Sequence, residues 1–149
     1  MTLADRFAVF IDGRIVQVGT PREVYAVPRT VDVAAFIGTP PMNLIPGLWD
    51  ANAVRVGDAI LPVARSSQRR EVIVGVRPAD LRVTAQGIPA IVERVEDLGD
   101  STIVSFDAGE RLLKQKRDRL ADVREGDAVH LGFAPEVVHL FDPASGARL

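Results

Sequence analysis

The sequence contains no cysteine. This absence excludes disulfide bonds and thiolate metal sites, and it suits a reducing compartment. Aromatic residues make up only 5% of the chain, too few for a surface on which nucleic-acid bases stack. The net charge of -2 comes from interleaved charges of both signs, so no basic stripe can neutralise a phosphate backbone. We therefore expect no nucleic-acid partner.

Long apolar runs are also missing. No stretch approaches the roughly 20 apolar residues that a membrane-spanning helix requires, and residues 1–6 lack the basic start and apolar stretch of a secretory signal. We expect a cytoplasmic protein, in which any association with a membrane goes through a partner.

The motifs of common catalytic sites are absent. The chain has no G-x-x-x-x-G-K-[ST] loop to hold a triphosphate, no G-x-G-x-x-G, no G-x-S-x-G and no H-E-x-x-H. His130 and His139 have no second histidine or cysteine at ligand spacing, which favours structural roles over a metal site. The acidic cluster in residues 93–100 is more typical of a solvated strand face than of catalytic carboxylates. We expect no catalytic, metal or cofactor site.

What remains is an ordinary globular composition, with 47% hydrophobic and 26% charged residues among 149. This length suffices for one domain with a core plus a fragment of another. The pattern changes near residue 43: a hairpin and two short helices are predicted before it, and short strands after it.

Local turn and cap chemistry predicts the first segment. Asp12-Gly13 is a type I′ turn pair between two apolar strands, 7–11 and 15–18. Thr20 and Glu23 form a capping box with proline at the first helical position, and this helix stops at Pro28. A second helix begins at Thr30-Val31-Asp32 and ends at Gly38 and Pro40-Pro41.

Alternating apolar residues and turn signals predict a β region with many short strands. The predicted strands are 44–48, 52–56, 59–63, 71–77, 88–97, 102–106, 110–115, 127–133 and 137–141. The charged stretch 116–125 is predicted to be a solvated connection with room for a helical turn. Such spacing favours a small barrel, or a pair of barrels, over a parallel sheet.

Three residues stand out in this region. Arg77 follows the apolar stretch 72–76, where it can bind an anion or a partner's carboxylate, or hold a neighbouring turn by donating to backbone carbonyls. The sequence leaves both roles open. Met42 and Trp49 are more typical of packing residues, and Trp49 is also a weak interface candidate.

Taken together, these segments resemble a known family. They are Met1-Thr2-Leu3-Ala4-Asp5-Arg6, Asp12-Gly13-Arg14-Ile15, Gln17-Val18-Gly19-Thr20-Pro21, Val24-Tyr25 with Pro28, Val33-Ala34-Ala35-Phe36-Ile37-Gly38, Pro41-Met42-Asn43, Gly75-Val76-Arg77-Pro78 and Val138-His139-Leu140-Phe141-Asp142. In this order they resemble the C-terminal part of ABC import ATPases, beginning after the switch histidine. Importers of the maltose, glycerol-phosphate and trehalose type are the most similar.

The resemblance implies a mainly β fold, with an OB-like, transport-associated (TOBE) barrel as regulatory domain over residues 44–149. Residues 1–43 would be an α+β remnant of the ATPase domain. The phosphate loop, the signature motif and the switch histidine would lie upstream of Met1. ATP and magnesium would therefore bind elsewhere in the parent subunit, and this chain alone would not be an enzyme.

The resemblance also implies partners and roles. We expect a homodimer, membrane permease subunits reached through the ATPase domain at the inner face of the cell membrane, and a possible regulatory protein. The structural and regulatory candidates are Met42 and Asn43 at the domain junction, Gly75, Arg77 and Pro78 in the barrel, and His139 and Phe141 in the closing strand.

Two further hypotheses concern binding and exposure. A free-standing small-ligand sensor on the same barrel is the alternative function, with residues 99–102 as a source of amide and hydroxyl donors, although Asp100 would repel an anion. The hairpin 7–18 is predicted to be mobile or to be covered by a second copy, because its strand edges lack sheet neighbours.

Overall fold

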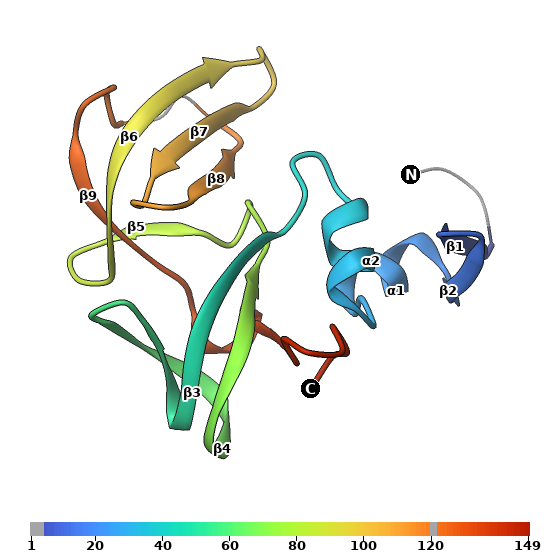
Figure 1. Cartoon of the computed structure of the whole chain (residues 1–149). Coiled ribbons are helices and arrows are strands. Elements are labelled where there is room, and N and C mark those ends of the chain that lie inside the picture. The colour runs from blue at the N-terminus through green and yellow to red at the C-terminus, as the bar shows by residue number, and fades with distance from the viewer. Residues whose placement is uncertain (1–4, 120–121) are drawn as a thin grey trace.

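Two curled antiparallel sheets dominate the structure, a computed structural model that describes residues 5–119 and 122–149 (Figure 1). One sheet has the order β10-β4-β3, and the other has the order β5-β9-β6-β7-β8. The strands are β3 (Asn43–Val56), β4 (Ala59–Val76), β5 (Arg82–Thr84), β6 (Ile88–Asp97), β7 (Thr102–Asp107), β8 (Leu112–Arg117), β9 (Ala128–Gly132) and β10 (His139–Phe141). The expected mainly β, OB-like fold is confirmed.

The N-terminal segment follows its local sequence signals. Strands β1 (Phe7–Ile11) and β2 (Arg14–Gly19) pair across a turn in which Asp12 and Gly13 both have positive φ, as a type I′ turn requires. Helix α1 (Pro21–Ala26) begins with the predicted capping box: the Glu23 amide donates to Thr20 Oγ1 at 3.2 Å, and the Thr20 amide donates to Glu23 Oε2 at 2.9 Å. Helix α2 (Val31–Phe36) is capped by the hydroxyl of Thr30.

The long ribbon β3–β4 differs from the prediction of four short strands. Predicted strands 44–48 and 52–56 form one strand, and 59–63 and 71–77 form another, because the chain bends at bulges instead of stopping. The register shifts on both sides of Ala51, which has a φ of 52°. In the sequence, a bulge interrupts the apolar alternation in the same way as a strand end does. The sequence pattern therefore could not distinguish the two.

The bend folds the tip of the ribbon over the barrel, so that Val54 and Leu61 are buried in the main core. The last predicted strand, 137–141, is also shorter, since a 3₁₀ turn (Pro135–Val137) precedes β10. The short strand β5 was not predicted. In the described part of 116–125 there is no helical turn, and residues 120–121 lie outside the described residues.

One large apolar core and two small clusters hold the structure together. The large core fills the space between the two sheets and includes Trp49, Val74, Phe106 and Leu131. A cluster of Val9, Val24 and Val33 joins the hairpin to the helices. A third cluster joins α2 to the barrel strands and is described below. The domain boundary after residue 43 stays a prediction.

The barrel is closed where the two sheets meet at the edge of β8. The side-chain amide of Asn43, at the start of β3, donates to the Lys114 carbonyl and accepts from the Lys114 amide, both at 2.8 Å. The Lys116 amide donates to the Pro78 carbonyl at 2.9 Å. Two of the predicted site residues, Asn43 and Pro78, therefore satisfy backbone groups of an edge strand.

Asn43→Asp should destabilise the barrel by about 1–3 kcal/mol, because the carboxylate loses the donor to the Lys114 carbonyl and is itself buried. Chemical denaturation at neutral pH measures this change. Asn52→Asp is the matched control, because Asn52 is exposed on the same strand. Equal stabilities of the two variants would contradict this account of barrel closure.

Candidate functional site at the helix–barrel seam

Five elements meet where the helices pack against the barrel: α1, α2, the start of β3, the end of β4 and β10. We call this region the seam and define it by Tyr25, Ala34, Ile37, Met42, Gly75, Arg77, His139 and Phe141. Its apolar centre is the cluster of Ala34, Met42 and Phe141, all buried. Figure 1 shows both helices against the middle of the molecule, between the hairpin and the barrel.

Gly75 allows the elements of the seam to approach closely. A Cβ atom at this position would lie 2.5 Å from Met42 Sδ, 3.0 Å from Phe141 Cε2 and 3.3 Å from His139 Cβ. A side chain here would force the seam apart. Four of the seven predicted site residues thus meet at Gly75, and the seam contains a fifth, Arg77.

Arg77 ties the helices to the barrel. Its Nη1 donates to the Ile37 carbonyl at 2.6 Å and makes a longer contact of 3.5 Å with the Ala34 carbonyl, while its Nη2 donates to the Tyr25 carbonyl at 2.7 Å. These carbonyls lie at the C-terminal ends of α2 and α1, where helices leave acceptors unpaired and carry partial negative charge. One guanidinium therefore satisfies the ends of two helices.

The charge of Arg77 is buried, with only 3% of the residue exposed. Its guanidinium carbon lies 4.1 Å from the centre of the Tyr25 ring, a cation–π contact. Burial lowers the pKa of Arg77 from its ordinary value, and Tyr25 and Asp80 oppose that shift. Among the described residues no carboxylate lies within ion-pair distance of Arg77. Of the two roles that the sequence left open for Arg77, its contacts match donation to backbone carbonyls and not the binding of a carboxylate.

His139 is the residue of the seam that acts as a neutral hydrogen-bond acceptor. Its Nδ1 lies 2.8 Å from Arg148 Nη1, and the arginine can only donate. Burial, together with the charges of Arg148 and Arg77, lowers the pKa of His139 to about 4. His130 is exposed on β9. Within residues 5–119 and 122–149, no group of three or more potential metal ligands gathers.

The chain's last residues add a second tie that the sequence did not reveal. The Val31 amide donates to the Gly146 carbonyl at 2.9 Å, and the Arg148 amide donates to the Arg29 carbonyl at 2.8 Å. Residues 146–148 therefore hold the start of α2, and Arg148 then reaches His139. No local pattern marks these contacts, because each joins segments far apart in the sequence.

Other candidates from the sequence lie apart from the seam. Trp49 is buried in the main core, in keeping with a packing role. In the turn 97–102, the Gly99 amide donates to Asp97 Oδ1 at 2.8 Å, and the Ser101 hydroxyl contacts Asp100 at 3.3 Å. These donors are engaged by the turn's own carboxylates, which leaves this turn poorly suited to an oxyanion. No helix in the described ranges is long and apolar enough to cross a membrane.

Comparison with known proteins identifies the region. The chain matches a MalK OB fold domain over residues 38–81 and a TOBE domain over residues 74–141. It is 38% identical over its whole length to an uncharacterised ABC transporter ATP-binding protein, y4oS, of Sinorhizobium fredii. It is 39% and 34% identical, again over its whole length, to sn-glycerol-3-phosphate import ATP-binding proteins of Agrobacterium fabrum and Bordetella avium.

The chain spans 42–44% of the length of these three relatives. Both matched domains and the whole-chain similarity lead to the same class. The chain carries MalK-type OB-fold and TOBE domains, and over its whole length it is similar to the C-terminal part of ABC importer ATP-binding proteins rather than to their catalytic domain.

Arg77→Lys should destabilise the protein by about 1–3 kcal/mol, because a single ammonium cannot reach both helix ends and one buried carbonyl loses its donor. Amide hydrogen exchange should accelerate in α1 and α2 more than in β6 and β7. Arg82→Lys is the matched control, since Arg82 also donates to backbone carbonyls but from an exposed position, and should change stability by less than about 0.5 kcal/mol. Uniform acceleration over the barrel would contradict the assignment.

Lowering the pH should destabilise the protein through His139. The unfolded chain takes up this proton near pH 6.5 and the folded chain only near pH 4, so the unfolded state binds more protons between these values. The free energy of unfolding therefore falls as pH drops through that window. Thermal midpoints at pH 7 and pH 5 measure it. His139→Gln should show a smaller fall than the natural sequence, and an equal fall in both proteins would refute the assignment.

Proposed function

We propose that this chain is the regulatory and dimerisation region of an ABC transporter ATP-binding subunit that energises import of a sugar or similar solute. The main support for this proposal is the whole-chain similarity to import ATP-binding proteins, together with the MalK-type OB fold and TOBE domains. ATP and magnesium would be bound, and ATP hydrolysed, by the remaining part of such a subunit. This chain would supply no catalytic residue.

The names of the relatives support a narrower solute class. Two of them import sn-glycerol-3-phosphate, so a phosphorylated polyol is a candidate solute beside sugars. The solute itself would be bound by other components of the transporter. The subunit would act with membrane permease subunits, through its ATPase part, at the inner face of the cell membrane.

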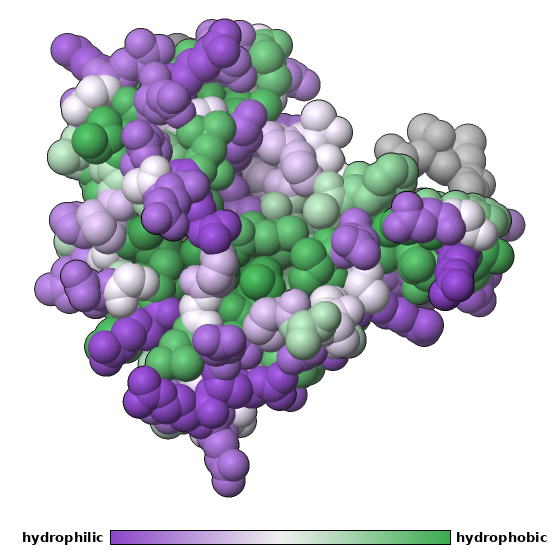
Figure 2. All heavy atoms as spheres, in the orientation of Figure 1, coloured by the Kyte–Doolittle hydropathy of each residue, from purple (hydrophilic) through white to green (hydrophobic). Residues whose placement is uncertain are grey.

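The hairpin supports the proposal that residues 1–43 complete an ATPase domain. Its inner face is packed against the helices, yet its outer face is apolar too, with Phe10 61% and Ile15 56% exposed. Figure 2 shows hydrophobic residues gathered on the lobe that contains β1 and β2. An apolar face of this kind marks a contact surface. We propose that the ATPase part covers it.

The seam suggests how the two parts would be coupled. Arg77 joins both helix ends to the end of β4, and Gly75 lets Met42 and Phe141 pack without a gap. The helices and the barrel should therefore move as one body when the ATPase part opens and closes. A pair of barrels could then keep two ATPase halves tethered during this cycle.

Two exposed apolar side chains on the barrel, which flank the exposed carboxylate of Asp107, are our candidate for the dimer contact. Ile91 on β6 and Leu112 on β8 both stand opposite Asp107 in the register of the sheet. Residues opposite one another in a sheet share a face, and Ile91 and Leu112 are 52% and 51% exposed. Two copies of this pair of side chains could bury one another around a twofold axis.

Sedimentation of the chain over a concentration series tests the dimer. We expect a concentration-dependent dimer whose dissociation constant rises about tenfold or more in Ile91→Glu and Leu112→Glu. Val83→Glu is the control, because Val83 is also partly exposed but lies on β5, at the opposite edge of the sheet from β8. A monomer at all concentrations would reject dimerisation by this region and favour a ligand sensor.

A further inference from the structure

The segment after β10 forms a strap, residues 142–147, between the barrel and the start of α2. The ends of the strap meet, because the Asp142 amide donates to the Ala147 carbonyl at 2.8 Å. Arg148, at the base of the strap, donates to Nδ1 of His139 on β10 at 2.8 Å. The strap is therefore a closed loop whose base is fixed to β10.

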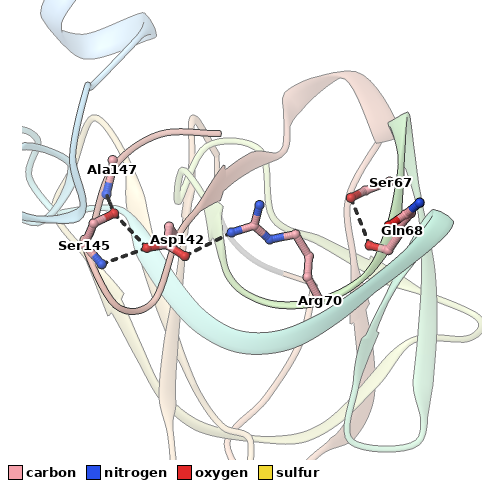
Figure 3. A network of polar contacts seen from close by, with 6 residues as sticks. All are labelled: Ser67, Gln68, Arg70, Asp142, Ser145 and Ala147. Carbon is pink, nitrogen blue, oxygen red and sulfur yellow. Dashed lines mark hydrogen bonds and ion pairs between the residues drawn. The ribbon is translucent and has the colours of Figure 1, made fainter.

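The carboxylate of Asp142 holds the strap in shape and joins it to β4 (Figure 3). Its Oδ2 accepts from the amide and the hydroxyl of Ser145, at 2.8 and 2.7 Å, and the Ser145 oxygen accepts from the Ala147 amide at 3.1 Å. Its Oδ1 lies 3.0 Å from Arg70 Nη2. The hydrogen bonds from Ser145, followed by the contact with Arg70, lower the pKa of Asp142 below its ordinary value. The carboxylate is therefore charged at neutral pH.

The far side of the strap holds the first residue of α2. The Val31 amide donates to the Gly146 carbonyl at 2.9 Å, and next to it the Arg148 amide donates to the Arg29 carbonyl at 2.8 Å. Val31 begins α2, and amides in the first turn of a helix find no acceptor within the helix. The strap therefore supplies part of the helix cap from a segment that is distant in the sequence.

The two ends of α2 are held unequally. At the C-terminal end, the buried Arg77 guanidinium donates to the Ile37 carbonyl at 2.6 Å. At the start, the strap is joined to β4 by an ion pair whose side chains, Arg70 and Asp142, are 40% and 25% exposed. An exposed ion pair contributes little free energy, because water and salt compete for both charges. The start of α2 is therefore the end that is more easily released.

The outer part of the strap is in contact with solvent. Residues 143–145 are exposed, and an open hollow of about 780 Å³ lies between residues 142–144 and residues 67–71 of β4. A segment with few buried apolar contacts and exposed polar contacts opens locally at a low free-energy cost. The strap has this character, whereas the apolar centre of the seam and Arg77 are buried.

We propose that the strap is a latch, which opens at the Arg70–Asp142 ion pair and releases the start of α2 while Arg77 keeps its hold on the C-terminal ends of both helices. With the strap closed, the helices and the barrel form one body. With the strap open, the helices gain freedom to pivot about Arg77. In the subunit proposed above, the open state would loosen the coupling between the ATPase part and the barrel, and in that respect the inference rests on the proposed function.

Amide hydrogen exchange of the purified chain, followed by NMR at neutral pH, tests the latch. Arg70→Gln removes the ion pair, and exchange of the Val31 amide should accelerate about two- to fivefold. The Ile37 amide, at the end of α2 that Arg77 holds, should exchange at an unchanged rate. Arg69→Gln is the matched control, because it removes the same charge from an exposed neighbour that makes no ion pair with any described residue. Amides of β6 report any change in global stability.

Salt provides a second readout of the same latch. Raising sodium chloride from about 0.05 to about 0.5 M screens exposed charges. Exchange at Val31 should therefore accelerate in the natural sequence and in Arg69→Gln. It should not accelerate in Arg70→Gln, because that variant has no ion pair left to screen.

Three outcomes would overturn the proposal: equal exchange at Val31 in Arg70→Gln and Arg69→Gln, an equal effect of salt on all three proteins, or acceleration at Ile37 as large as that at Val31. In the last case α2 would be released as a whole, and the strap would not act separately from Arg77. Failure of the proposed import function would leave these exchange rates of the purified chain unchanged, so the two failures are distinguishable.

Discussion

The hydrogen bonds from the Arg77 guanidinium to the ends of two helices are the interaction on which the arrangement of this protein depends. Helices α1 and α2 are each only six residues long, too short to be stable alone. Their C-terminal carbonyls need donors in a place that water scarcely reaches, and one planar cation supplies them at 2.6 and 2.7 Å. The buried charge is stabilised in return by those carbonyls and by the Tyr25 ring.

The rest of the seam follows from that constraint. For Arg77 to reach the helix ends, the end of β4 must lie directly against α2, which leaves no room for a side chain at Gly75. Asn43 and Pro78, on either side of the same junction, then face β8 and satisfy its edge. The residues that place the helices and those that close the barrel are therefore neighbours. A substitution that displaces one set should also displace the other.

The protein combines a firmly packed centre, the seam, with exposed apolar surfaces away from it. The seam has buried ties to both helices and to residues 146–148, whereas Phe10 and Ile15 on the hairpin and Ile91 and Leu112 on the barrel are more than half exposed. The role that we propose, a region that links moving parts of a transporter subunit, would use such a distribution of firm internal contacts and exposed apolar surfaces.

Sequence alone determined the features that depend on neighbouring residues: the Asp12-Gly13 turn, the capping box of α1 and the bounds of strand 88–97, which β6 reproduces. The ordered motifs also sufficed to identify the family. Only the tertiary structure decided the partners of Arg77, which lie 40 and 52 residues away, and of Asn43, 71 residues away. It also decided that two pairs of short strands are one bent ribbon. Turns and caps are short-range chemistry, whereas an arginine's acceptors and a bulge's curvature are set by segments that meet only after the chain has folded.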